Sequence, residues 1–299
     1  MPTSHVMTTM RRIIAAFASI ALITAFMPVT AIAAPTQDAP LTAQAADIAR
    51  GTSGTCSWVI DGSGKLTIRP TSGDSGTLGI MNDMPPWEAH AAKITSVVIE
   101  PGVRDNGTPA EPGNLNGMFK GCTAMTSADL SGLDTASAGK MDRMFAGCSA
   151  LESLDISGFD MQRVGSATEM FKGCSALKAL DLSNFDTKSV TFMNSMFEDC
   201  AALETLDISS FDTSGVQGGM RYMFKNCAKL TSLDVSKFNT STTKYMTEMF
   251  AGCASLKTLD VSKFDTSACQ DVTSMFAGCT ALENLDVSNF DTSKMSSLQ

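Results

Sequence analysis

Residues able to carry out nucleophilic or acid–base chemistry are few in this sequence, and their spacing does not assemble a catalytic set. The chain has two histidines, His5 and His90. The string Gly73-Asp-Ser-Gly76 copies the residues around a trypsin-type nucleophile, but that chemistry needs a histidine base and a buried aspartate. Neither histidine stands in a matching context, so a glycine and serine turn is the better interpretation. We therefore expect no catalytic residues and no enzyme.

Seven of the nine cysteines recur at a fixed spacing and could suggest a metal site or a set of disulfides. A metal site needs ligands that converge on one point, whereas a regular series runs in a line. Disulfides between neighbouring copies are conceivable from the expected separation, although seven is an odd number. Packing as small buried hydrophobic residues is the preferred interpretation, and we expect no metal and no cofactor. The series is Cys122, Cys148, Cys174, Cys200, Cys227, Cys253 and Cys279.

Aspartate and serine recur with the same spacing and form a candidate ligand-facing column. Unit charges about 4.8 Å apart repel by roughly 1 kcal/mol in water. Hydrogen bonds from serine or backbone groups are the preferred means of offsetting this repulsion. A bound cation or another ligand are the alternatives, although the glycine-rich calcium-binding nonapeptide is absent. The candidate residues are Asp155, Asp181, Asp207, Asp234, Asp260, Asp286, Ser157, Ser183, Ser209, Ser236 and Ser262.

These columns belong to a repeat whose landmarks are Met-Phe pairs. Successive pairs are separated by 26, 26, 26, 27, 26 and 26 residues, a period typical of leucine-rich-repeat solenoids. The pairs begin at Met118, Met144, Met170, Met196, Met223, Met249 and Met275.

Within each copy, the alternation of residues 154–157 predicts a half-buried strand, so stacked copies should form a parallel sheet. The apolar spacing of residues 193–197 predicts short helical turns on the other face. Gly, Asn or Asp precedes each cysteine of the series, which predicts a left-handed backbone conformation at that position.

The N-terminal third divides into three segments. Residues 1–33 have the charged start, short apolar run and Ala-x-Ala ending of a secretory signal peptide. The run is shorter than the roughly 18 residues that a membrane span requires, so we expect no span in the mature chain. The composition of residues 34–50 predicts a flexible leader. Residues 51–114 predict a small β-rich N-terminal cap, in which Trp87 plugs the first coil of the solenoid.

Residues 115–299 then form the predicted leucine-rich-repeat solenoid, with seven copies of 26 or 27 residues. The last copy stops halfway, so we expect further repeats downstream. The formal net charge is -9, or -11 once the two arginines before residue 33 are removed. An acidic chain without a basic cluster argues against nucleic acid and anionic membranes as partners.

With these columns in view, the chain resembles the BspA-type bacterial surface proteins. The matching string is Leu-x-x-Leu-Asp-x-Ser-x-Phe-Asp-Thr-Ser followed by Met-Phe-x-Gly-Cys, carried by residues 118–299. The resemblance implies a secreted or cell wall-associated adhesin that contacts a host extracellular or cell-surface protein or glycan. A passive spacer that presents a downstream domain is one alternative. The accessory region of a surface enzyme whose catalytic domain lies elsewhere is another.

Overall fold

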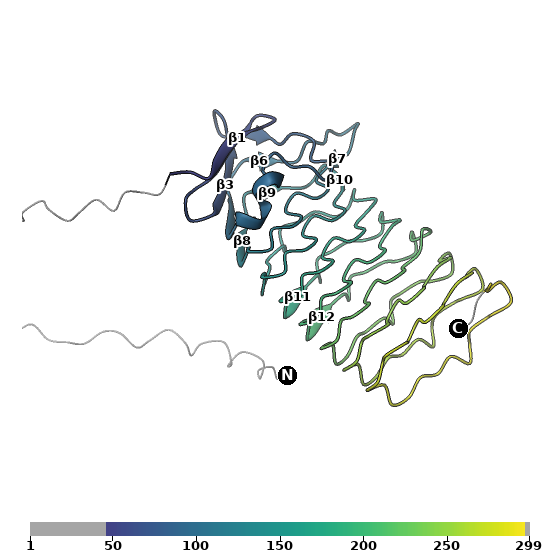
Figure 1. Ribbon diagram of the computed structural model, residues 1–299. Coiled ribbons are helices and arrows are strands. Elements are labelled where there is room, and N and C mark those ends of the chain that lie inside the picture. Colours follow the sequence, from purple (N-terminus) through teal and green to yellow (C-terminus); the bar gives the residue numbers. More distant parts are fainter. Residues whose placement is uncertain (1–45, 297–299) are drawn as a thin grey trace, which may run out of the picture. The chain divides into compact units, whose positions relative to one another are not determined.

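Alternating apolar and polar residues near the beginning of the described chain form its first strands (Figure 1). The computed structural model describes residues 46–296, so the predicted signal peptide and leader residues 34–45 lie outside it. Strands β1 (Ala49–Ser53), β2 (Cys56–Ile60) and β3 (Lys65–Pro70) pair antiparallel in that order. Because Ala49 already pairs with Ile60, the predicted leader, 34–50, extends two residues too far.

The cap continues directly into the repeats. Strand β5 (Ser96–Ile99) pairs in parallel with β3, and β8 (Ser127–Asp129) pairs in parallel with β5, so the cap and the first repeat share one sheet. Coil geometry therefore begins before residue 115, the predicted boundary between cap and solenoid. The remaining elements here are β4 (Gly76–Thr77), η1 (Glu88–Lys93), β6 (Val103–Arg104), β7 (Gly113–Asn114), β9 (Leu133–Asp134) and β10 (Ala138–Lys140).

The predicted parallel sheet is present on one face of the repeats. Strand β11 (Ala179–Asp181) pairs in parallel with β12 (Thr205–Asp207), and Asp181 lies opposite Asp207. Farther along the stack, single parallel bridges join Ser232, Thr258 and Asn284. Each copy therefore places the same sequence position beside its neighbour.

The opposite face consists of hydrogen-bonded turns. Within one copy, the N–H groups of Met170, Lys172 and Cys174 each donate to the carbonyl three residues earlier. The N–H groups of the residues between them donate to the next coil instead, at 2.7–2.9 Å. The predicted helical turns are thus present as single turns and not as a continuous helix. Two left-handed residues per copy, such as Glu169 and Gly173, interrupt the helical path.

The core between the two faces is filled by columns of like side chains. Seven phenylalanines of the Met-Phe pairs stack with ring centroids 5.6–5.8 Å apart. At the capped end, Trp87 is fully buried, meets Trp58 edge-on at 5.9 Å and donates its indole N–H to the Met118 carbonyl at 2.8 Å. The prediction that Trp87 plugs the first coil is confirmed.

Candidate ligand-binding face

Each aspartate of the candidate column closes a small turn with the serine two residues later. The backbone N–H of Ser183 donates to Oδ1 of Asp181 at 2.9 Å, and Ser209 does the same for Asp207 at 2.9 Å. In the first two copies, the serine hydroxyl adds a second bond to the same oxygen, from Ser131 to Asp129 and from Ser157 to Asp155, each at 2.7 Å. Hydrogen bonding therefore offsets part of the repulsion along the column, as predicted from the sequence.

These bonds stabilise the charged form of the carboxylates. The backbone N–H and the hydroxyl of Ser183 lower the pKa of Asp181, while its neighbour Asp155 raises it slightly. The hydroxyl and backbone N–H of Ser236 lower the pKa of Asp234 in the same way. The column is therefore anionic at neutral pH. Its hydrogen bonds to described residues fall on Oδ1, which leaves Oδ2 facing solvent.

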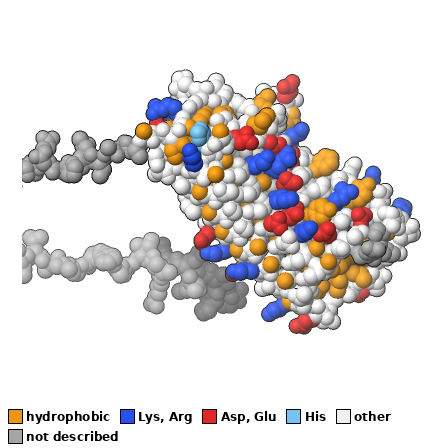
Figure 2. Space-filling model, in the orientation of Figure 1, with side chains coloured by type: hydrophobic (Ala, Val, Ile, Leu, Met, Phe, Trp, Pro, Cys, Tyr) orange, Lys and Arg blue, Asp and Glu red, His pale blue; other side chains and the backbone are white. Residues whose placement is uncertain are grey.

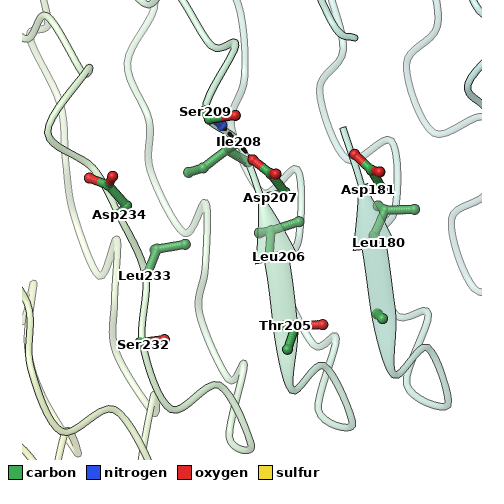
Figure 3. Close-up of a pocket in the computed structure, with 11 residues that line it drawn as sticks. Leu180, Asp181, Thr205, Leu206, Asp207, Ile208, Ser209, Ser232, Leu233 and Asp234 are labelled. Carbon is green, nitrogen blue, oxygen red and sulfur yellow. Dashed lines mark hydrogen bonds between the residues drawn. The ribbon is translucent and has the colours of Figure 1, made fainter. Parts of the chain in front are cut away.

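Three consecutive coils form a shallow groove on this face, with a volume of about 480 Å³. Figure 3 shows Asp181, Asp207 and Asp234 in a row along it, with a hydrogen bond between Ser209 and Asp207. The apolar side chains of Leu206 and its two neighbours in the same column line the groove beside the carboxylates. The structure thus brings three of the six predicted aspartates together in one concave surface. Ser209 also lines the groove, and the remaining predicted residues lie on the same exposed face but outside it.

The groove offers charge and hydrogen-bond acceptors but no assembled catalytic set. Within the described part of the chain, no three His, Cys, Asp or Glu side chains are grouped so that they could hold a metal ion. His90 lies in η1 of the cap, far along the chain from the groove. The arrangement can therefore bind a ligand through ionic and polar contacts.

A second acidic column also forms turns of this kind. It consists of Asp134, Asp160, Asp186, Asp212, Asn239, Asp265 and Asp291. Oδ1 of Asp212 accepts a bond from the Ser214 N–H at 2.9 Å, and Oδ1 of Asn239 accepts one from Ser241 at 3.1 Å. Asparagine closes the turn as well as aspartate does, so this column needs no negative charge. These side-chain-to-backbone bonds two residues apart are Asx-turns.

The cysteine column lies in the core and has no nucleophilic role. All nine cysteines, which fall within residues 46–296, are free thiols. The thiol of each repeat cysteine from Cys148 onward donates to a phenylalanine carbonyl of the preceding coil at 3.1–3.2 Å. Burial raises the pKa of the Cys174 thiol to about 12, which suppresses the reactive thiolate. The preferred interpretation, packing, is confirmed.

Sequence reasoning missed the charge pattern that crosses the coils outside the candidate column. Figure 2 shows acidic and basic side chains lying close together across the stack. Lys172 pairs with Glu198 at 2.8 Å, and Lys225 with Glu248 at 2.6 Å, each bridging two neighbouring coils. These charges stand at positions whose residues differ from copy to copy, so the repeat pattern gives no signal for them.

Solved structures with some similarity to this chain include two bacterial proteins. One solved structure is a leucine-rich repeat protein from Eubacterium ventriosum ATCC 27560, 15% identical, with a TM-score of 0.31 over 85% of this chain and 96% of that chain. Another is a leucine rich cell surface protein from Faecalibacterium prausnitzii A2-165, 16% identical, with a TM-score of 0.23 over 84% of this chain and 96% of that chain. No curated protein matches the sequence.

Among residues 46–296, no helix combines the length and apolarity needed to cross a membrane. The repeats themselves match a family model over residues 113–218 and 202–299. Because these two segments cover more than half of the chain, the protein belongs to the family described as "Mycoplasma protein of unknown function, DUF285".

Proposed function

We propose that this protein is a secreted or cell wall-associated adhesin that contacts a host extracellular protein or glycan through its repeat surface, and that it is not an enzyme. The supporting observation is the groove along Asp181, Asp207 and Asp234, where stacked coils present the same charged group at regular intervals. A rigid stack with many equivalent positions suits the binding of an extended macromolecule. The resemblance to BspA-type surface proteins and the signal-like residues 1–33 favour the same role.

A spacer that presents another domain is the second candidate, and one observation favours it. Each aspartate of the groove already accepts a bond from the serine two residues later, so the face is stable without a ligand. The two candidates differ in one consequence. An adhesin depends on the charge of the groove, whereas a spacer does not.

The test is the binding of the protein to immobilised matrix proteins and to epithelial cells. We would compare the wild type with the triple variant Asp181→Asn, Asp207→Asn and Asp234→Asn. Asparagine removes the charge and keeps the turn, as it does naturally at Asn239. An adhesin that uses this groove should lose most of its binding in the triple variant.

The matched control changes three aspartates of the second acidic column, Asp186→Asn, Asp212→Asn and Asp265→Asn. This removes the same charge outside the groove, at two of the same coils and, because the third coil already has Asn239, at the coil after it. Equal binding by the wild type and both variants would reject the groove as the contact surface. No retention of the wild type on any surface would favour the spacer.

A further inference from the structure

The single 27-residue step in the repeat spacing coincides with a change in surface chemistry. The extra residue falls at Gly218-Gly219, on the coil between Phe192 and Tyr245. Phe192 replaces a position that Ser166 holds in the preceding coil, and the two residues form a parallel bridge. Both tyrosines of the chain, Tyr222 and Tyr245, lie in this part of the stack. The repeat is therefore altered at one place, where it gathers aromatic side chains outside the core.

The glycine pair makes room for the two rings. A Cβ atom on Gly218 would lie 2.4 Å from Cδ1 of Phe192, and one on Gly219 would lie 3.0 Å from Cβ of Tyr245. Gly219 also has a φ of 102°, a conformation that favours glycine. The Phe192 ring thus packs against bare backbone and leaves 48% of its surface exposed. This is unusual, since the described phenylalanines of both repeat columns are buried or half-buried.

An arginine lies on the same coil as the glycine pair. The guanidinium of Arg221 lies over the Tyr245 ring, 3.6 Å from its centroid, and the Arg221 backbone N–H donates to the side chain of Asn194 at 3.0 Å. Arg221 forms no ion pair with any carboxylate of residues 46–296. Its N–H groups are therefore fixed in orientation by stacking and available to an outside acceptor.

The size of the apolar surface indicates the kind of ligand. A stable protein interface buries about 800 Å² on each partner and has an apolar centre. Among the described residues, the other exposed large apolar side chains are Ile80, Met84 and Val287, on other coils, so Phe192 is a single exposed apolar side chain in this part of the stack. One aromatic ring matches the C–H face of one sugar ring, because the negative face of an aromatic system attracts polarised C–H groups. A neighbouring arginine supplies donors for the sugar oxygens. The footprint thus favours a carbohydrate over a protein.

We infer that Phe192, Arg221 and Tyr245 form a carbohydrate-binding site in which one sugar ring stacks on Phe192 and Arg221 donates hydrogen bonds to its oxygens. This inference rests on the proposed binding function and names a ligand class and a second surface for it. The acceptor oxygens could be hydroxyls of a neutral sugar or the carboxylate of an acidic one. Comparing the binding of a neutral glycan with that of its acidic derivative distinguishes these two acceptors.

The test measures binding of the protein to lactose, N-acetyllactosamine, oligomannose and sialyllactose by calorimetry and saturation-transfer NMR. Phe192→Ser and Arg221→Thr introduce residues that neighbouring coils hold at these positions, Ser166 and Thr247, so the stack should fold in both variants. We expect Phe192→Ser to weaken binding about tenfold or more. Arg221→Thr should weaken sialyllactose more than lactose if the carboxylate is the acceptor. Asp212→Asn, in the second acidic column and outside both proposed surfaces, is the matched control and should bind like the wild type.

Three outcomes would overturn the inference: no saturation transfer from any of the four glycans, equal binding by the wild type and both variants, or cell binding that needs Phe192 but survives enzymatic removal of cell-surface glycans. The last outcome would identify a protein partner. If the wild type adheres to cells and Phe192→Ser adheres equally, the inference fails and the proposed function stands. If glycans bind at this site but the protein does not adhere to cells or matrix, the proposed adhesin role fails and the site stands.

Discussion

A column of buried threonines holds neighbouring coils together, and Thr213→Val tests how strongly. Thr213 is fully buried, and its Oγ1 donates to the carbonyl of Asn239 at 2.9 Å while accepting the N–H of the same residue at 2.7 Å. One hydroxyl thus satisfies both backbone polar groups of one residue in the next coil. Thr187 makes the same pair of bonds to Asp212, both at 2.9 Å.

Valine has the shape of threonine without the hydroxyl, so Thr213→Val leaves the N–H and the carbonyl of Asn239 without their partner, next to a fully buried side chain. An unsatisfied buried group costs about 1–3 kcal/mol. Thr213→Val leaves two such groups, and small backbone shifts let them regain part of their hydrogen bonding. We therefore expect the free energy of unfolding to fall by about 2–4 kcal/mol. Thr213→Ser keeps the hydroxyl and loses one methyl group, so it should cost about 1 kcal/mol.

The assay is urea unfolding followed by circular dichroism, combined with hydrogen exchange at the Asn239 amide because repeat arrays can open locally. Thr205→Val, at an exposed position of β12, is the control and should change little. The reasoning would be refuted if Thr213→Val unfolded like the wild type and its Asn239 amide exchanged no faster. One coil already has Met161 in this column, so the fold tolerates a coil without the threonine hydroxyl. The experiment measures how much free energy of unfolding that hydroxyl contributes.

Four further predictions concern single sites. Trp87→Phe should lower the free energy of unfolding, measured by urea unfolding, by about 1–3 kcal/mol, because the buried carbonyl of Met118 loses the indole N–H as its hydrogen-bond donor. Stability should fall as pH rises from 9 toward 12, because burial raises the pKa of Cys174 from 9.0 to about 12 and the unfolded thiol ionises first; Cys174→Ala should reduce that pH dependence. Ser236→Ala should raise the pKa of Asp234, because its hydroxyl is the main cause of the lowered value, and carboxylate NMR titration would show the change; an unchanged pKa contradicts this assignment. Glu169→Gly should unfold at higher urea than Glu169→Ala, because Glu169 has a φ of 58° and glycine avoids about 1–2 kcal/mol of left-handed strain.

Structural features could be predicted from the sequence where every copy has the same type of residue at the same position. The burial of Leu151, Phe171 and Cys174 follows from apolar residues at fixed positions of every copy. The left-handed residue before each cysteine could be predicted because Gly, Asn and Asp fill that position. Asp199 and Asn226, with φ of 63° and 61°, confirm it.

The turns of the opposite face could not be predicted in detail because their second left-handed position has no residue bias. Arg143, Glu169, Ser195 and Tyr222 all occupy it with φ of 56–60°, and only the first copy has glycine there, at Gly117. Apolar spacing alone then favours a helix. The candidate groove was predicted as a column, but the sequence could not show that three of its aspartates share one hollow, because that depends on the curvature between coils.

The strain at this second position explains why the coils depend on one another. A left-handed residue without glycine costs about 1–2 kcal/mol, and each one turns its N–H away from its own coil. That N–H then donates to the next coil, from Ser195 to Arg221 at 2.8 Å and from Glu248 to Thr273 at 2.9 Å. A single coil would have the strain without this bond, so the turn is stable only when a neighbour is already in place. Surface groups such as Asp207 and Phe192 are therefore held in fixed positions by the stack and not by their own copy.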